Sequence, residues 1–372
     1  MKTNSKGLYV HIPFCAKKCN YCDFCSFAGL NEDVKLAYID KLCKEIASYK
    51  NDKIEIDTIF FGGGTPTLLE PRDLRKIMSV IRESFALTES AEITMEANPG
   101  TANFEKLAAF VNCGINRFSI GLQTTRENES KKLGRIHTYD QFLSMYDSLR
   151  KLGIKNINVD LMYGIPLQTI ESFTETLNSI TKLSPEHISV YGLILEEGTP
   201  FYDEKANLAL PSEDVECDMY DLACKSLSDA GYDHYEISNY AKPGYESRHN
   251  LKYWHTAEYI GVGLSAYSYY NGIRFGNTDN LKDYLNSENT IVQNELIDTD
   301  MQKYEYVMLA LRLKNGFSLS NYKKLFSEDF IQGREDKIAH FKKAGYLTID
   351  NDRLSLTEKG FYVSNSIIVE LL

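Results

Sequence analysis

Three cysteines lie close together near the start of the chain, at Cys15, Cys19 and Cys22. The loop that carries them is polar, so burial in an apolar core does not explain the cluster. Thiolates are soft ligands, and three of them on one short loop can converge on a soft metal centre. A structural zinc site normally takes four ligands from two pairs, and no second pair at such spacing follows in the sequence. The pattern therefore favours a cubane iron–sulfur cluster with one iron free of protein thiolate.

Glycines and polar side chains stand at the ends of later strand-like runs. The run of glycines in Gly62-Gly63-Gly64-Thr65-Pro66 follows the second strand-like run, and residues without a side chain let the backbone approach a ligand closely. Glu96, Gln123 and Asp160 end the third, fourth and fifth runs. Each alone has an ordinary explanation as a helix cap or a hydrogen bonder in a loop. Together they place a polar group at the carboxyl end of successive parallel strands, where barrel folds build their active sites.

The elements that must position these residues alternate between two patterns. The runs typical of strands are 8–12, 58–61, 92–96, 117–122, 157–162 and 187–193. The stretches with helical periodicity are 34–49, 71–85, 103–113, 139–151 and 172–183. This alternation predicts an α/β fold, a parallel sheet with helical crossovers. Its extent indicates a partial, TIM-like (β/α)6 barrel, short of the eight units of a full barrel.

The rest of the chain changes character twice. A helix is predicted over 212–230, and an irregular stretch rich in Tyr, Asn and Gly follows it. From residue 301, short helical patterns lead to a hairpin and a closing helix, which is typical of a winged-helix-like α+β module. The predicted division is a barrel over 1–230, an irregular extension packed on it over 231–300, and a smaller winged-helix-like domain over 301–372.

The composition limits the partners and the compartment. The 372 residues include 41 Lys and Arg against 52 Asp and Glu, a net charge of −11, which argues against nucleic acid as the main partner. No apolar run approaches the roughly 20 residues of a membrane-spanning helix. The first residues, Met1–Gly7, are polar and show no signal-peptide pattern, so a cytoplasmic protein is predicted.

The cysteine motif, with Tyr21 just before its last cysteine, resembles that of the radical S-adenosylmethionine (SAM) enzymes. The resemblance implies that Cys15, Cys19 and Cys22 bind a [4Fe-4S] cluster whose fourth iron is chelated by the amine and carboxylate of SAM. It also implies that an electron from the cluster cleaves SAM into methionine and a 5′-deoxyadenosyl radical. The Gly-rich loop and the strand-end polar residues occur in the order that this family shows.

Three further blocks narrow the resemblance to the coproporphyrinogen III oxidase-like (HemN/HemW) branch: residues 9–15 (YVHIPFC), 133–137 (LGRIH) and 158–166 (NVDLMYGIP). This resemblance implies that Tyr9, Gly63 and Glu96 contact the cluster-bound SAM. The residues that match those holding a second SAM in the oxidase are Tyr21, Gly64, Thr65, Gln123, Arg135 and Asp160. A guanidinium at Arg135 suits a carboxylate clamp, and Asp160 suits an acceptor for ribose hydroxyls or an amine.

The branch contains oxidases and haem chaperones, and this chain resembles the chaperones. The oxidase type has a long extension before its cluster loop and an extra cysteine two positions after the third ligand, where this chain has Phe24. The block 248–254 (RHNLKYW) matches the HNxxYW block typical of the chaperone type. The resemblance therefore implies a protein that binds haem and hands it to acceptor haemoproteins. His249 is the candidate haem ligand, with a hydrogen-bonded structural histidine as an equal alternative.

Some alternatives stay open at this point. The chain could instead be an oxygen-independent coproporphyrinogen III oxidase or a haem-degrading radical SAM enzyme. Cys25 is interpreted as a spare thiol or a structural residue, with a cluster or haem contact as the alternative. The implied partners are haem, SAM, acceptor haemoproteins and an electron donor such as flavodoxin or ferredoxin. A peripheral contact with membrane haemoproteins, and either a monomer or a dimer, also fit the sequence.

Overall fold

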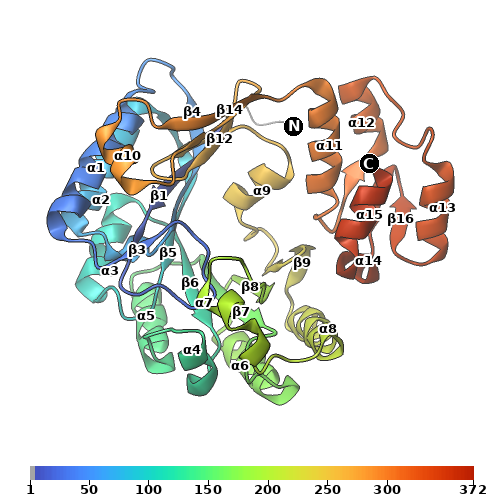
Figure 1. The fold of residues 1–372 in the computed structure, drawn as a ribbon, viewed down its shortest axis with the longest axis horizontal. Helices are drawn as coiled ribbons and strands as arrows, with labels where there is room; N and C mark the ends of the chain where they lie inside the picture. The colour runs from blue at the N-terminus through green and yellow to red at the C-terminus, as the bar shows by residue number, and fades with distance from the viewer. Residues whose placement is uncertain (1–4) are drawn as a thin grey trace.

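A single curved sheet forms the body of the molecule in the computed structural model, which describes residues 5–372 (Figure 1). The first four residues of the polar N-terminal stretch lie outside this range. In sheet order the strands are β14 (Ile291–Leu296), β13 (Ile273–Asn277), β12 (Tyr267–Tyr270), β11 (Tyr259–Val262), β1 (Lys6–Ile12), β4 (Glu55–Gly63), β5 (Ala86–Ala97), β6 (Arg117–Gln123), β7 (Ile157–Tyr163), β8 (His187–Gly192), β10 (Asn239–Ala241) and β9 (Asp233–Glu236). Neighbouring strands from β11 through β8 pair in parallel, and the strands beyond each of these pair antiparallel.

Helices cover the outside of the parallel strands and connect them (Figure 1). They are α1 (Glu32–Ala47), α2 (Pro71–Ser84), α3 (Phe104–Cys113), α4 (Glu127–Lys132), α5 (Tyr139–Lys151), α6 (Ile170–Leu183) and α8 (Glu213–Asp229). Polar caps begin several of them: the side chains of Asn31, Thr138 and Ser212 each accept a hydrogen bond from the backbone three residues ahead. Shorter pieces are α7 (Pro200–Asp203) and the 3-10 turns η1 (Pro66–Leu68) and η2 (Lys205–Asn207). The predicted α/β partial barrel is confirmed.

The two faces of the parallel strands differ in polarity. Side chains such as Val10, Phe61 and Ile120 belong to the large apolar core that the outer helices cover. Alternate residues of the same strands point the other way, because successive side chains of a strand lie on opposite faces. Those residues include Glu96 and Ser119, which line a cavity inside the barrel. The inside of the barrel is therefore polar, which suits a charged ligand.

The stretch predicted to be irregular is largely ordered into strands and short helices. It supplies β9 to β14 and the helices α9 (Arg248–Trp254) and α10 (Leu281–Asn286). Strand β11 pairs with β1, so this part of the chain extends the sheet at one end, and the β9–β10 hairpin extends it at the other. Helix α9 lies in the opening between the two ends of the curved sheet (Figure 1). The expectation of an irregular stretch was wrong because short strands paired with distant partners leave little local pattern.

A smaller C-terminal domain lies beyond α9, on the right in Figure 1. It contains α11 (Thr299–Ala310), β15 (Phe317–Ser318), α12 (Leu319–Phe326), α13 (Glu335–Lys343), β16 (Leu347–Asp350), β17 (Arg353–Leu356), α14 (Glu358–Tyr362) and α15 (Ser364–Leu371). Three strands in the order β15-β17-β16, with packed helices and their own apolar core, give the predicted winged-helix-like arrangement. Backbone hydrogen bonds join it to the barrel, from Ile237 N–H to Arg312 O and from Lys314 N–H to Tyr235 O.

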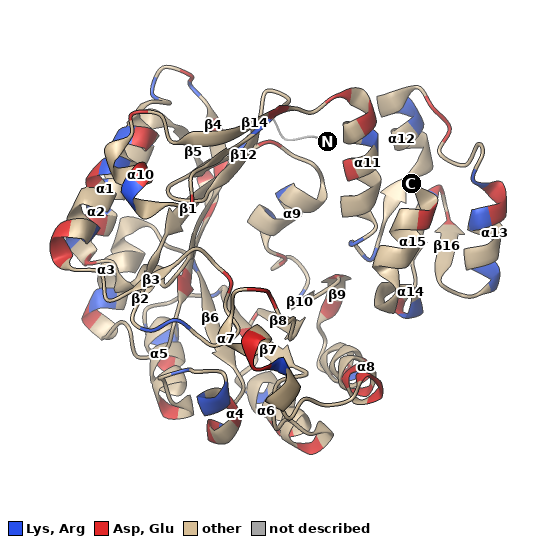
Figure 2. Ribbon diagram, viewed as in Figure 1, with Lys and Arg blue, Asp and Glu red and all other residues tan. Residues whose placement is uncertain are grey.

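Charged residues of both signs are mixed along outer helices such as α1 and α13 (Figure 2). None of the helices described is both long enough and apolar enough to cross a membrane.

Gly316 offers a test of how the C-terminal domain is built. Its φ is +49°, and a Cβ there would lie 1.9 Å from the Leu354 carbonyl oxygen of β17. We expect Gly316→Ala to loosen this domain and expose it to limited proteolysis, while cluster assembly in the barrel is retained. Gly345→Ala is the matched control, because Gly345 also has positive φ but open space around it. Gly345→Ala is expected to lower the free energy of unfolding only by the cost of holding Ala in a left-handed conformation, about 1–2 kcal/mol. Equal protease resistance of the two variants would contradict this account.

Candidate cluster and SAM site

A cavity opens at the carboxyl ends of the parallel strands, and the cysteine loop forms part of its wall. Cys15, Cys19 and Cys22 all line it. Most of the other residues predicted from the sequence line the same cavity: Tyr21, Gly63, Gly64, Glu96, Gln123, Arg135 and Asp160. Thr65 lines a second cavity that shares Cys19 and Arg135 with the first. The structure therefore brings together in one place the residues that the sequence scatters over 146 positions, from Cys15 to Asp160.

The three thiols suit a cluster better than a single metal ion. All are free, and none of the described residues form a group of three or more His, Cys, Asp or Glu side chains close enough to bind one ion. A cubane is larger than an ion and takes its thiolates at separate corners. Burial raises the pKa of the Cys22 thiol to about 11, so it stays protonated until a metal charge compensates the thiolate. The donor set and its surroundings fit an iron–sulfur cluster.

Strand β1 and the Gly-rich loop hold the cysteine loop in place. A short parallel pair, β2 (Phe14–Cys15) with β3 (Phe27–Ala28), closes the base of the loop. His11 is buried and neutral, since burial lowers its pKa, and its Nε2–H donates to the Cys25 carbonyl at 2.8 Å. The Tyr9 hydroxyl lies 3.0 Å from the other ring nitrogen of His11. Tyr9 is thus placed under the loop rather than in the cavity wall.

Glycine is required at Gly63 and Gly64 for a steric reason. Gly63 has φ +108°, and a Cβ there would lie 2.4 Å from the His11 ring. At Gly64 a Cβ would lie 2.6 Å from the Phe14 carbonyl oxygen. The backbone at the end of β4 therefore packs directly against the segment that leads into the cluster loop. The Gly63 N–H also donates to a Glu96 carboxylate oxygen at 3.1 Å.

Two carboxyl groups face the cavity, Glu96 from β5 and Asp160 from β7, the strands on either side of β6. Burial, and then the nearby Asp160 carboxyl, raise the pKa of Glu96 to about 8. Burial also raises the pKa of Asp160, although hydrogen bonds oppose the shift. Ser119 Oγ and Asn158 Nδ2 donate to the two Asp160 oxygens at 3.1 and 2.7 Å. Burial disfavours the ionised forms of both carboxyl groups. A ligand such as SAM, which brings positive charges and hydroxyl donors, would stabilise them.

The raised pKa of Glu96 predicts a pH dependence of stability for the SAM-free protein. An unfolded Glu ionises near 4.5 and the folded one near 8, so between these values the folded chain keeps a proton that the unfolded chain has lost. The free energy of unfolding then falls as the pH rises through that window. We expect Glu96→Gln to lose less stability than wild type between about pH 5 and 8. Melting temperatures measured across that range that stay parallel for the two proteins would contradict the assignment.

Arg135 links the cluster loop to the strand ends. Its Nη2 donates to Asn98 Oδ1 at 2.7 Å and to the Gly121 carbonyl, and its Nη1 lies 3.6 Å from Cys19 Sγ. Its buried Nε has no partner among the described residues, so the guanidinium keeps a donor for a ligand. Asn98 also donates to Thr65 Oγ1 at 2.8 Å. The predicted residues Arg135 and Thr65 therefore meet through Asn98.

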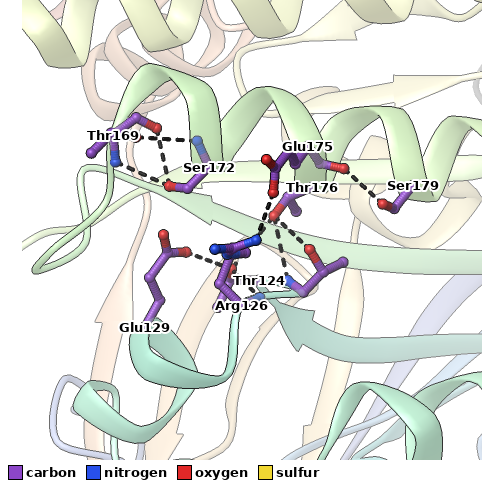
Figure 3. Close-up of polar contacts among 9 residues, drawn as sticks. Thr124, Arg126, Glu129, Thr169, Ser172, Glu175, Thr176 and Ser179 are labelled. Atoms are coloured by element: carbon purple, nitrogen blue, oxygen red, sulfur yellow. Dashed lines mark hydrogen bonds and ion pairs between the residues drawn. The ribbon is translucent and has the colours of Figure 1, made fainter.

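Figure 3 shows a polar cluster between β6 and α6. This cluster holds the segment that precedes Arg135 in the chain. Thr124 Oγ1 donates to the buried Glu129 carboxylate at 2.6 Å, and its oxygen accepts from Arg126 N–H at 3.0 Å. Arg126 Nη1 then pairs with Glu175 of α6 at 2.7 Å. These contacts fix α4, whose last turn leads directly into Arg135.

Comparisons with known proteins agree with this geometry. Residues 9–180 match the radical SAM superfamily, and residues 300–363 match the HemN C-terminal domain. The chain is 35% identical to the heme chaperone HemW of Lactococcus lactis over 100% of this chain and 98% of the relative. It is 34% identical to the heme chaperone HemW of Escherichia coli, with 97% of each covered. The chain belongs to the HemW family.

A solved structure shows the same fold. This HemW-family chain superposes on coproporphyrinogen III oxidase (HemN) from Escherichia coli with a TM-score of 0.87, covering 100% of this chain and 91% of that one. The sequence identity is 23%, so this likeness concerns the fold alone. The match to the radical SAM superfamily, together with the HemW relatives, implies a [4Fe-4S] cluster and SAM as cofactors.

His249 lies away from the cavity of this HemW-family protein. It sits in α9, 1% exposed, and Phe60 packs beside its ring. Its Nδ1 is 2.9 Å from Thr58 Oγ1 and its Nε2 is 2.8 Å from the Tyr253 hydroxyl. Burial lowers the pKa of His249 to about 3. Because both ring nitrogens are hydrogen-bonded, the geometry favours the structural alternative for His249.

Sequence reasoning missed some of the residues that complete the site. Asn98 joins Thr65 to Arg135, and its position two residues after Glu96 at a strand end was a usable signal. Asn158 and Ser119 support Asp160. Their contacts depend on which strands are neighbours, which no local pattern gives.

Proposed function

We propose that the chain binds haem at the mouth of the barrel and passes it to acceptor haemoproteins. The observation that carries this is the likeness, over the whole length and including the C-terminal domain, to relatives named heme chaperone HemW. The barrel cavity would hold the [4Fe-4S] cluster and SAM beneath the haem. The chain would act in the cytoplasm, with reducing equivalents from a flavodoxin or a ferredoxin.

Each predicted residue has a part in this proposal. Cys15, Cys19 and Cys22 would hold the cluster, which when bound supplies the single electron that cleaves the sulfonium of SAM. Gly63 and Glu96, which line the cavity, would contact the cluster-bound SAM. Tyr9, the third residue predicted to contact SAM, lies behind His11 and would reach that ligand only from beneath the cluster loop. A second SAM or a similar ligand would lie against Tyr21, Gly64, Thr65, Gln123, Arg135 and Asp160. The free donor of Arg135 would take a carboxylate.

Apolar side chains around the mouth support haem binding there. Phe24, Ile136 and Ile194 are 59%, 63% and 68% exposed. Phe24 lies between β2 and β3, Ile136 between α4 and α5, and Ile194 just after β8. Phe24 lines the first cavity, Ile136 lines the second, and Ile194 follows the carboxyl end of β8, the end of the parallel strands at which the cavity opens. Exposed apolar groups around such an opening mark a surface for an apolar ligand. Lys17 and Lys18 line the same cavity and carry charge complementary to the haem propionates.

A haem titration of the anaerobically reconstituted protein tests the proposal. We expect saturable binding with a Soret band distinct from free haem, together with quenching of Trp254, the one tryptophan of the chain. A parallel incubation with coproporphyrinogen III, SAM and dithionite is expected to give no decarboxylated product. Product formation without haem binding would replace the proposal by the oxidase alternative, and consumption of bound haem would replace it by the haem-degrading alternative.

A further inference from the structure

A continuous chain of hydrogen bonds leaves the cavity at Asp160 and crosses the inside of the barrel. Asn158 Nδ2 donates to Asp160 Oδ1 at 2.7 Å, and Asn158 Oδ1 lies 2.6 Å from Nδ1 of His187. The other ring nitrogen of His187 lies 2.8 Å from the Tyr235 hydroxyl. That hydroxyl oxygen in turn accepts from the backbone N–H of Ser247 at 3.2 Å.

The direction of every bond in this chain is fixed. His187 is 1% exposed and neutral, since burial and the Arg117 charge lower its pKa. Asn158 already donates through Nδ2, so its Oδ1 accepts from His187 Nδ1–H. His187 Nε2 must then accept from the Tyr235 hydroxyl, whose oxygen accepts from Ser247. All donors thus point toward the Asp160 carboxylate, and aligned hydrogen bonds of this kind polarise one another.

The hydrogen-bond chain ends, at Tyr235 and Ser247, where β9, α9 and the C-terminal domain meet. Ser247 is the N-cap of α9, its hydroxyl accepting from Asn250 N–H. The Tyr235 carbonyl accepts from Lys314 N–H of the C-terminal domain. Trp254, at the end of α9, carries the Arg312 guanidinium over its ring at 5.9 Å, and its indole N–H is buried without a partner among the described residues. A shift of α9 or of the C-terminal domain would change the surroundings of this tryptophan.

We propose that His187 and Tyr235 are positioning residues that couple occupancy of the cavity at Asp160 to the junction of α9 with the C-terminal domain. The inference rests on the proposed function in one respect, that SAM is the ligand beside Asp160. A ligand that donates a hydrogen bond to Asp160 competes with Asn158 for the same carboxylate. The weakening of the Asn158–Asp160 hydrogen bond is passed along the aligned hydrogen bonds to Ser247. By linkage, the factor by which SAM shifts the equilibrium at the junction equals the factor by which the junction changes the affinity for SAM.

The experiment compares two Tyr→Phe variants of the cluster-loaded protein. Tyr235→Phe removes the hydroxyl from the chain. Tyr253→Phe is the matched control, because its hydroxyl lies equally 2.8 Å from Nε2 of a buried histidine, His249, but outside the chain. SAM is titrated into each, with Trp254 emission excited at the red edge and calorimetry as readouts. His187→Leu, which has neither a donor nor an acceptor, serves as a second variant, and circular dichroism checks that each variant is folded.

Wild type and Tyr253→Phe are expected to show a SAM-dependent change in Trp254 emission. Tyr235→Phe and His187→Leu are expected to lose that change and to bind SAM about fivefold more tightly, because Asn158, no longer polarised by the chain, competes less strongly for Asp160. An emission change and affinity in Tyr235→Phe equal to those of the control overturn the coupling, as does a wild type that binds SAM with no change in emission. A wild type that binds no SAM overturns the proposed SAM site itself, and the coupling with it.

Discussion

Replacing Cys15, Cys19 or Cys22 by Ala is expected to abolish assembly of the [4Fe-4S] cluster, whereas Cys25→Ala leaves assembly intact. The three thiols line one cavity, and a cubane held by only two of them would lose a corner ligand without a substitute. Cys25 does not line that cavity; its thiol lies 3.5 Å from the Asp279 carbonyl, which it contacts as a weak donor. Cys25 therefore packs against the apolar core and is not placed to bind the cluster.

Iron and sulfide content and the EPR spectrum of the reduced protein measure this directly. Wild type and Cys25→Ala are expected to hold about four irons per chain and to give the same spectrum. Each of the other three variants is expected to hold almost none after the same reconstitution. A Cys25→Ala protein that folds but lacks the cluster would mean that the ligand set is wrong.

His249→Ala is expected to lower the free energy of unfolding by roughly 2–4 kcal/mol while leaving the Soret band of bound haem unchanged. The substitution leaves Thr58 Oγ1 and the Tyr253 hydroxyl without their partner inside the barrel, and it opens a cavity beside Phe60. The imidazole is not available to iron, because both of its nitrogens are engaged. Under the proposed function, haem would therefore take its contacts at the mouth of the barrel.

The control for this prediction is a substitution at the mouth. Ile194→Ser changes a side chain that is 68% exposed, so it costs little stability but removes apolar contact from the proposed haem surface. Haem affinity is expected to fall in Ile194→Ser and to stay near wild type in His249→Ala. A shifted Soret band in a folded His249→Ala protein, with normal binding in Ile194→Ser, would contradict the placement of haem.

The parallel part of the barrel could be predicted because its signals are local. Runs such as 117–122 and 157–162 are apolar and bounded by polar loops, and they fall within β6 and β7. The amphipathic stretch 71–85 becomes α2 almost unchanged. Glu96 and Gln123, at the carboxyl ends of β5 and β6, follow from the same pattern, because parallel strands bring their carboxyl ends to one edge. Asp160 was predicted to end its strand, but it lies in the middle of β7, which continues to Tyr163.

The remainder depends on pairing between distant residues. Strand β14 is exposed along its whole length, so it carries no alternation between buried and exposed side chains. Strand β11 joins the sheet beside β1, about 250 positions earlier in the chain, as the pairing of Gly7 with Tyr259 shows. The contacts of Asn98 and His187 likewise follow from strand register. For His249, the motif pointed to chemistry, and only the packing of α9 against Thr58 and Tyr253 showed both ring nitrogens in use.

Transfer of haem to an apo-haemoprotein tests the central claim most directly. The anaerobically reconstituted chain, loaded with haem, is mixed with apomyoglobin and the absorbance of holomyoglobin is followed with time, with the Cys22→Ala protein and free haem as references. We expect the wild type to lose its haem to apomyoglobin in a reaction whose rate depends on the concentration of the chain and differs from that of free haem. Haem that stays on the chain, or that moves only at the rate of free haem, would contradict a haem-chaperone function.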